Sequence, residues 1–294
     1  MAKAVGGLPG FRDFYPDEFA ARAFIQQTWR EVARRFGFVE YDGPPLEPLE
    51  LYTKKSGDEI VGQLYNFTDK GEREVALRPE LTPTFARMVG ARANALRKPI
   101  RWFSIPQLFR YERQQKGRLR EHFQLNVDIV GEADAVADAE LLAVAVESMR
   151  AFGLTAADVV ARVSDKRLLA ALLTVVGFEQ DVHGDVMQVI DKLERQPKEL
   201  SREKLQRIGA SSSAVDMVMA LPSSGLDVFE SSLRGKGHYE ASLDEFKRYL
   251  DRCDALGIAD FVKFDPSIVR GLAYYTGIVF ELFDTSGEFR AICG

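Results

Sequence analysis

Three short clusters of polar side chains in this 294-residue sequence could carry chemistry. In the first, Arg78, Glu80 and Thr82 place a cation, a carboxylate and a hydroxyl at a predicted strand-to-helix corner. The N–H groups that open a helix favour anions, so this corner is a candidate site for a charged ligand. Capping of the helix by Thr82 is the simpler interpretation, but it leaves Arg78 and Glu80 without a role.

The second cluster lies on two predicted neighbouring strands. Gln124, Asn126 and Asp128 alternate with apolar residues, and a period of two puts the three polar side chains on one face. Such a face is either a solvated surface or the floor of a polar pocket. Arg110 and Glu112 share a face of the preceding strand by the same rule, so a hairpin would bring a guanidinium and carboxylates into one concave site.

The segment that joins these two strands is basic, with Arg113, Lys116, Arg118 and Arg120 inside eight positions. The whole chain has a net charge of −5, which is unusual for a protein that holds nucleic acid through a broad basic surface. Any nucleic-acid contact is therefore expected to be local, and this segment is the candidate for it. A solvated surface loop is the alternative.

The third cluster combines Arg270 and Gly271 with Tyr274 and Tyr275, just before a predicted strand. Taken alone, this combination is a weak functional signal.

Turn and helix signals predict the elements that position these residues. Pro16 and the acidic residues after it predict a helix over 16–36 that ends at Gly37. The Pro-rich stretch 43–48 is predicted to be extended, at a sheet edge or a contact surface. Further predictions are a hairpin of 65–67 with 75–77, a helix from an N-cap at Thr82 through Pro83 to Gly90, and strands over 101–112 and 123–130.

The second half of the chain is predicted to be mainly helical. A helix is expected over 134–152 and a short strand over 159–163. Residues 164–257 have almost entirely helical patterning, with breaks at Gly177, Pro197, Gly209 and 222–225. Strand patterning returns at 261–264, 276–283 and 289–293. We therefore predict a core formed by 1–163 and 258–294, the second segment being incomplete, with a helical insertion domain over 164–257.

Composition predicts an ordinary globular protein, because 46% of the residues are hydrophobic and no apolar run reaches 18 residues. The N-terminal residues lack the pattern of a signal peptide, which favours a cytoplasmic location and no membrane. Cys253 and Cys293 are far apart and have no metal-site spacing, so both are expected to be free thiols.

Together these segments resemble the class II aminoacyl-tRNA synthetases, and specifically the histidyl-tRNA synthetase family, over essentially the whole chain. Residues 16–36 with 45–47 resemble the family's first motif, which is used for dimerisation, and 109–131 resemble its second motif. The stretch 270–277 resembles the signature peculiar to the histidyl enzymes. The resemblance implies an α+β fold with a mainly antiparallel sheet flanked by helices and a helical insertion domain, and it implies a homodimer.

The resemblance also implies roles for single residues. The histidine pocket would be lined by Glu80, Thr82, Gln124, Asp128, Tyr274 and Tyr275, and the catalytic cations facing the α-phosphate would be Arg110 and Arg270. ATP would contact Arg110, Glu112, Arg118 and His122, and tRNA(His) would contact Arg113, Lys116 and Arg120. ATP is expected to bring Mg²⁺, with no metal held by the protein alone.

This chemistry suits the residue types. When the carboxylate of histidine attacks the α-phosphorus, negative charge grows on the phosphate oxygens, and guanidinium groups placed there in advance stabilise it. The carboxylates of Glu80 and Asp128 suit the ammonium and imidazole N–H groups of histidine.

The sequence departs from the family pattern at several places. His122 stands where many members have phenylalanine, Asp128 where some have glutamate and Ala273 where some have aspartate. The stretch 290–294 stops where the family continues into its third motif, so an ATP-binding arginine and an anticodon-binding domain are expected to be missing. Such a truncated form is expected to be poorly active.

Two other functions fit the same residues. One is the catalytically silent regulatory subunit of ATP phosphoribosyltransferase, which shares the fold and senses histidine, and the other is an inactive fragment of the synthetase. Arg110, Gln124, Arg270 and the intact basic segment favour the synthetase, because a regulator needs neither ATP nor tRNA contacts.

Overall fold

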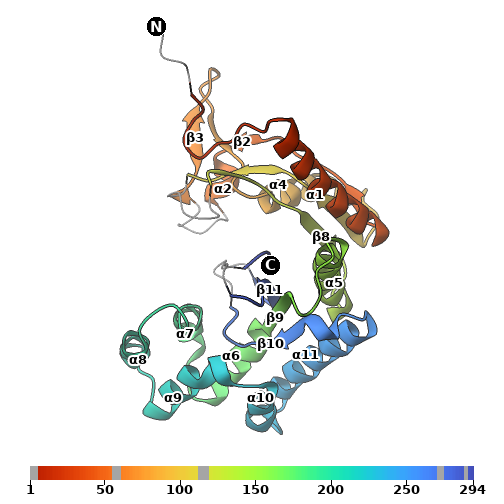
Figure 1. The fold of residues 1–294 in the computed structure, drawn as a ribbon. Coiled ribbons are helices and arrows are strands. Elements are labelled where there is room, and N and C mark those ends of the chain that lie inside the picture. Colours follow the sequence, from red (N-terminus) through yellow and green to blue (C-terminus); the bar gives the residue numbers. More distant parts are fainter. Residues whose placement is uncertain (1–5, 55–60, 112–118, 270–274, 288–290) are drawn as a thin grey trace. The chain divides into compact units, whose positions relative to one another are not determined.

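The computed structural model describes residues 6–54, 61–111, 119–269, 275–287 and 291–294. The chain divides into two compact units, Met1–Glu132 and Ala133–Gly294 (Figure 1). Within the described residues, no helix is both long enough and apolar enough to cross a membrane.

The first unit combines helices with short strands. Its helices are α1 (Pro16–Arg35), α2 (Glu50–Thr53) and α4 (Thr82–Ala91). Its strands are β1 (Val39–Glu40), β2 (Leu46–Pro48), β3 (Tyr65–Thr68), β4 (Glu74–Leu77), β5 (Ile100–Ser104), β6 (Gln107–Phe109), β7 (Glu121–Phe123) and β8 (Asn126–Val130). They form sheets in the orders β1-β5-β8, β2-β4-β3 and β6-β7, in which only the β1–β5 pair is parallel among the described strands.

Several elements form as their sequences predict. Helix α1 has proline in its first turn, and Gly37 follows its end with a φ of 76°, a left-handed conformation that glycine adopts without strain. In the β3–β4 hairpin, the Asp69 carboxylate accepts hydrogen bonds from the backbone N–H groups of Gly71 (2.8 Å) and Arg73 (3.0 Å). Strand β2 lies at a sheet edge, where its one proline, Pro48, is tolerated.

The two long strands predicted around the basic segment are each interrupted, which corrects the sequence prediction. Pro106 has no N–H to continue a ladder, so β5 ends at Ser104 and a separate strand, β6, follows. On the partner side the interruption falls at Gln124, whose N–H donates to the Pro106 carbonyl at 3.3 Å. The shared-face argument therefore holds for Asn126 and Asp128 but does not extend to Gln124.

The second unit packs helices around one three-stranded sheet. Its helices are α5 (Ala135–Ala151), α6 (Lys166–Val175), α7 (His183–Ile190), α8 (Lys198–Arg207), α9 (Ser212–Ala220), α10 (Leu226–Leu233) and α11 (His238–Ala255). Its strands are β9 (Val159–Asp165), β10 (Val262–Phe264) and β11 (Ile278–Asp284). Strand β9 is central, parallel to β10 and antiparallel to β11.

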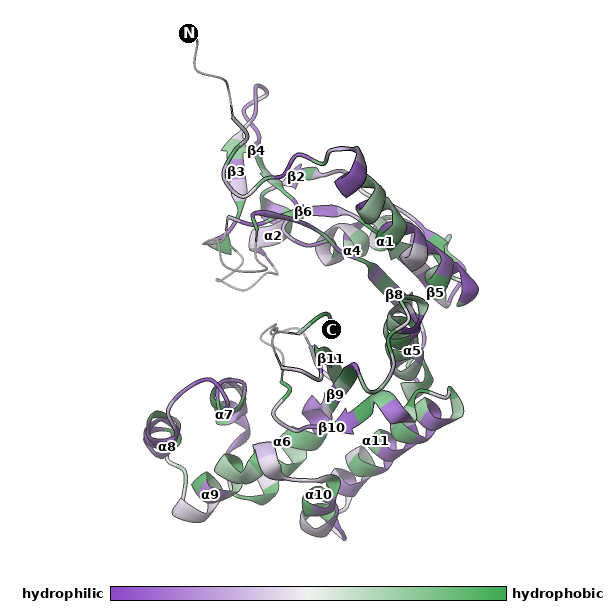
Figure 2. Cartoon of the chain, in the orientation of Figure 1, coloured by the Kyte–Doolittle hydropathy of each residue, from purple (hydrophilic) through white to green (hydrophobic). Residues whose placement is uncertain are grey.

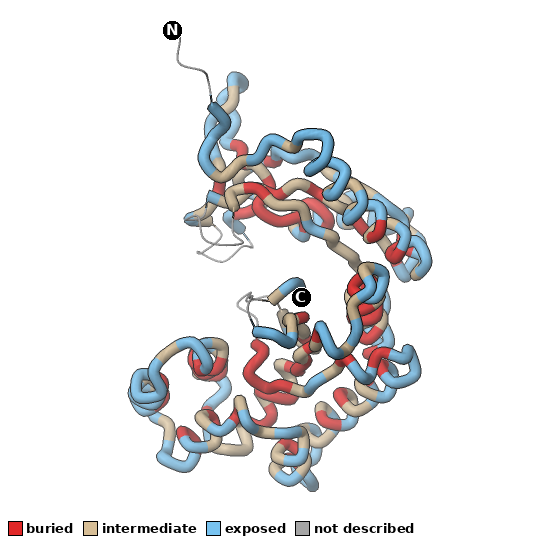
Figure 3. The backbone as a smooth tube through the Cα atoms, viewed as in Figure 1, coloured by how far each residue is buried: buried red, intermediate tan, exposed pale blue. Residues whose placement is uncertain are grey.

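Hydrophobic helix faces build the core of this unit. Leu142 and Val146 of α5, Leu168 and Leu172 of α6, and Phe246 of α11 are fully buried. Figure 2 shows the contrast between apolar α6 and hydrophilic α8, and Figure 3 shows the burial of each segment. The α+β, antiparallel-rich fold class is confirmed, whereas the boundaries predicted for an insertion domain at 164 and 257 stay a prediction.

Candidate active site

Arg78 follows β4 and is a structural tie rather than an open binding group. Only 4% of its surface is exposed. Its Nη1 donates to the Asp42 carboxylate (2.6 Å) and the Gly43 carbonyl (2.8 Å), and its Nε donates to the Gln107 carbonyl (3.0 Å). One guanidinium thus joins three chain segments at the strand-to-helix corner, which gives Arg78 the role that helix capping could not.

The corner continues into α4 in a way that corrects one local prediction. The N-cap of α4 is Leu81, and Thr82 is already the first helical residue, so its exposed side chain makes no capping hydrogen bond. Proline is tolerated anywhere in the first turn, and Pro83 takes the second position here. Glu80 is buried just before the helix.

Asp128 lies on β8, at the edge of the sheet formed by β1, β5 and β8 in the same unit. It is opposite Trp102 in the β5–β8 register, and the Trp102 ring lies 5.4 Å from that of Tyr41. Asp128 is half-buried, and this desolvation raises the pKa of its carboxyl from 3.8 to about 7. No described residue forms a hydrogen bond or ion pair with it, so the carboxylate is available to a ligand.

Two tyrosines that sequence reasoning missed belong to this region. Burial raises the pKa of Tyr41 strongly, with a further contribution from the charge of Asp128. Burial likewise raises the pKa of Tyr52 to about 12, and Glu80 contributes in the same direction. The positive charge of Arg78 lowers the pKa of both hydroxyls, so the two tyrosines lie between the corner that holds Glu80 and the strand that holds Asp128. Their positions, outside any recognisable motif, carried no signal in the sequence.

Arg110 is placed next to the Glu80 corner. It follows β6, its Nε donates to the Pro79 carbonyl at 2.9 Å, and its backbone N–H donates to the carbonyl of Arg120 at 2.9 Å. Arg120 in turn places its guanidinium 4.1 Å from the centre of the Tyr111 ring. The hydrogen bond to Pro79 thus places Arg110 beside the chain segment that carries Glu80, and a shared ligand pocket stays a prediction.

The other predicted site residues lie away from the Glu80 corner in the sequence of elements, or they are not among the described residues. His122 is half-buried on β7 opposite Leu108, and Gln124 is exposed. Tyr275 belongs to the second unit, where the Lys166 ammonium lies 5.8 Å from its ring centre. Outside the described residues lie Glu112, Arg113, Lys116, Arg118, Arg270 and Tyr274.

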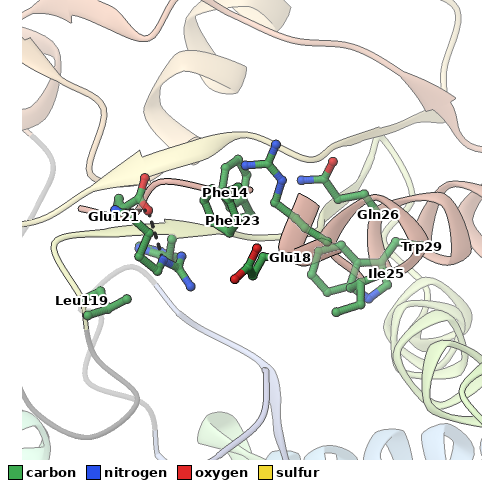
Figure 4. Close-up of a pocket in the computed structure, with 11 residues that line it drawn as sticks. Phe14, Glu18, Ile25, Gln26, Trp29, Leu119, Glu121 and Phe123 are labelled. Carbon is green, nitrogen blue, oxygen red and sulfur yellow. Dashed lines mark hydrogen bonds and ion pairs between the residues drawn. The ribbon is translucent and has the colours of Figure 1, made fainter. Parts of the chain in front are cut away.

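A cavity of about 390 Å³ lies between α1 and β7 (Figure 4). The Arg22 guanidinium stacks between the rings of Phe14 (4.2 Å) and Phe123 (4.6 Å) at its wall. Buried Glu121 accepts hydrogen bonds from the backbone N–H (3.2 Å) and the Nε (3.1 Å) of Arg12. Large exposed apolar side chains also lie on the first half of α1, namely Phe19, Phe24 and Ile25, and exposed Tyr15 directly precedes the helix.

Comparison with solved structures defines the class of fold. An ATP phosphoribosyltransferase regulatory subunit/histidyl-tRNA synthetase from Bacillus halodurans C matches 97% of this chain and 74% of its own, with a TM-score of 0.83 and 22% identity. Histidyl-tRNA synthetase from Nostoc sp. PCC 7120 matches 95% of this chain and 65% of its own, with a TM-score of 0.81 and 22% identity. The chain therefore has the α+β fold of these proteins.

Sequence comparison narrows the class to one family. The family model described as histidyl-tRNA synthetase matches residues 10–292. Histidine–tRNA ligase from Opitutus terrae is 47% identical over 98% of this chain, and the chloroplastic/mitochondrial histidine–tRNA ligase of Arabidopsis thaliana is 42% identical over 97%. The chain belongs to the histidyl-tRNA synthetase family. It spans 67% and 58% of the length of these two relatives.

Proposed function

We propose that this chain is the catalytic region of a histidine–tRNA ligase, which activates histidine with ATP to histidyl-adenylate and transfers the histidyl group to tRNA(His). The observation that carries the proposal is the half-buried Asp128 carboxylate in a chain of this family. It forms no ion pair with a described residue, and a cationic amino acid would supply the missing positive charge.

The neighbouring residues support an amino acid as ligand. Glu80 and Asp128 supply acceptors for the ammonium and the imidazole N–H of histidine. Arg110, which lies against the same corner, suits the α-phosphate oxygens on which negative charge develops during carboxylate attack. In this proposal Arg270 is the second such cation, and Tyr274, Tyr275, Thr82 and Gln124 complete the histidine pocket.

The remaining ligands follow from the reaction. ATP would bring Mg²⁺ and contact Glu112, Arg118 and His122, while Arg113, Lys116 and Arg120 would contact tRNA. Mg²⁺ would neutralise phosphate charge when bound, and the guanidinium groups would orient the α-phosphate for in-line attack. A cytoplasmic location stays a prediction.

We further propose that the chain forms a homodimer through α1. The adjacent exposed apolar side chains Phe24 and Ile25 of α1 support this, because a monomer gains nothing by exposing them. A two-fold interface would use the same face of both copies. Sedimentation at tens of micromolar should give a dimer, and Phe24→Glu should shift it to monomer; an unchanged dimer would place the interface elsewhere.

The decisive measurement is histidine-dependent exchange of pyrophosphate into ATP by the full-length polypeptide. Exchange is expected, and Arg270→Ala should slow it about 100-fold or more while histidine affinity stays nearly unchanged, because this contact forms mainly in the transition state. Arg202→Met is the matched control, since the ion pair of Arg202 with Asp216 lies on the surface of the helical region and includes no proposed site residue. Histidine binding without any exchange would favour the regulatory-subunit function.

A further inference from the structure

The sheet of β1, β5 and β8 places Tyr41 and Asp128 on one face. Trp102 of β5 pairs with Val39 of β1 on one side and with Asp128 of β8 on the other, and paired residues of neighbouring strands share a face. Tyr41 comes two residues after Val39, so it shares that face as well. Its backbone N–H donates to a carbonyl of β5 at 2.9 Å, which continues the parallel pairing and sets Tyr41 beside Ser104.

Aromatic neighbours fix the position of the Tyr41 ring on this face. Its ring centre lies 5.4 Å from that of Trp102 and 5.5 Å from that of Phe85 on α4, and the latter two ring centres are 6.2 Å apart. Ser104 is buried, and its small side chain leaves room for the tyrosine ring to extend over β5 toward β8. The ring contacts thus hold the Tyr41 hydroxyl toward the strand that carries Asp128.

The Tyr41 hydroxyl and the Asp128 carboxylate both lack a hydrogen-bond partner among the described residues. The hydroxyl oxygen of Tyr41 is buried, and Asp128 is half-buried. Burial raises the pKa of the Tyr41 hydroxyl, and the charge of Asp128 raises it further. The hydroxyl therefore stays protonated at neutral pH and can donate, whereas an ionised carboxylate can only accept. One face of the sheet thus carries a donor and an acceptor that complement each other.

The other charged groups that act on Tyr41 already pair with each other. Asp42 raises the pKa of the Tyr41 hydroxyl and Arg78 lowers it. Arg78 donates to the Asp42 carboxylate at 2.6 Å and to two backbone carbonyls at 2.8 and 3.0 Å. Its guanidinium is therefore committed to the corner after β4. Among the described groups around Tyr41, the hydroxyl is the donor that remains for the Asp128 carboxylate.

We propose that Tyr41 is a positioning residue for Asp128: in the histidine complex its hydroxyl donates a hydrogen bond to the Asp128 carboxylate, which holds that carboxylate ionised and directed at the ligand. The inference rests on the proposed function, because histidine is the ligand of Asp128 in that proposal. Desolvating an ionised carboxylate is unfavourable unless donors or cations compensate for it. The ligand supplies one N–H, and Tyr41 supplies a second donor from the protein.

Tyr41→Phe removes the hydroxyl and keeps the ring, so the contacts with Trp102 and Phe85 are retained. Calorimetry on the full-length polypeptide should show histidine affinity about tenfold weaker at pH 7.5, near the lower end of the range for a hydrogen bond to a charged group. The pH at which ionisation of Asp128 strengthens binding should also move upward, because a donor to the carboxylate favours its ionised form. A packing role alone would weaken binding without moving this midpoint.

A double-mutant cycle tests whether the hydroxyl acts through Asp128. In the Asp128→Asn background, Tyr41→Phe should change histidine affinity by less than about threefold, because the charge that the hydroxyl compensates is gone. The full tenfold loss in that background would overturn the inference, as would an unmoved pH midpoint in the single variant. Tyr249→Phe on α11 is the matched control, since it removes a fully buried tyrosine hydroxyl from the second unit. It should leave affinity and midpoint at their wild-type values.

Failure of the proposed function gives a different result. A wild-type protein that binds histidine but shows no histidine-dependent pyrophosphate exchange would contradict the ligase activity, and the affinity measurements would still decide on Tyr41. Exchange by wild type, together with unchanged histidine affinity in Tyr41→Phe, would contradict the role of Tyr41 alone.

Discussion

Two aspartates, one in each unit, stand in opposite electrostatic situations. Asp165 is 1% exposed, and its carboxylate meets the Arg167 guanidinium at two atoms and caps α6 through the Arg167 N–H at 2.7 Å. Asp128 is half-buried without such a partner among the described residues, and its pKa is raised to about 7. Desolvating a carboxylate is unfavourable unless a cation or N–H donors compensate for it. The first aspartate therefore stabilises the fold, whereas the second keeps a carboxylate that no described residue compensates.

The largest effect on stability is expected at Asp165. Asp165→Ala removes both the ion pair with Arg167 and the cap of α6, and should lower the free energy of unfolding by about 3–5 kcal/mol. Urea denaturation at pH 7.5 measures this. Asp165→Asn keeps the cap and should lose less than Asp165→Ala. Equal losses in the two variants would mean that the ion pair dominates and the cap contributes little.

Asp128→Asn should instead raise the free energy of unfolding of the unliganded protein. Because the folded-state pKa of Asp128 is raised, its contribution to stability is full below pH 4 and is lost as pH rises through about 7. Above pH 7 the wild type carries an uncompensated carboxylate that the amide variant lacks, so the variant should be more stable by up to about 4 kcal/mol. The unfolding free energies of wild type and Asp128→Asn, measured from pH 4 to pH 8, should become equal at the acidic end. A variant less stable than wild type at pH 8 would contradict this.

The smallest of these effects, in energy, concerns the ligand. At pH 8 Asp128→Asn should weaken histidine binding about 10- to 100-fold, the size of a lost hydrogen bond to a charged group. Between pH 6 and pH 8 the ionisation of Asp128 should strengthen binding to wild type. The amide variant should retain only the pH dependence of histidine itself. Calorimetric titrations of both proteins in matched buffers separate the ionisation of Asp128 from that of histidine. Identical pH profiles of histidine affinity in the two proteins would remove Asp128 from the site.

The sequence predicted elements wherever local chemistry decides the conformation. Pro16 opens α1 and Asp69 directs the β3–β4 turn, because each acts on the backbone within a few residues of itself. The interruption at Pro106 carried an equally local signal, since a proline inside a strand pattern argues against a continuous strand. Thr82 was wrongly placed at the cap because proline is accepted at either of the first helical positions.

The site was less predictable, because its geometry depends on contacts between residues far apart in the chain. The family resemblance pointed to Glu80, Asp128 and Arg110, but Tyr41 and Tyr52 have no motif and reach the region only through packing. Arg78 belonged to a recognised cluster, yet its partners Asp42 and Gln107 lie 36 residues before it and 29 residues after it, so its structural role was not visible.

The contact between Arg12 and Glu121 also constrains how the first unit is assembled. It joins residues 109 positions apart, so forming it closes a very long loop, and contacts of this kind form late in folding because the entropy of closure must first be offset by local structure. Arg12 emerges from the ribosome long before Glu121 does. During synthesis the segment around Arg12 must therefore wait for β7, and Phe14, whose ring packs against Phe123 of that strand, waits with it.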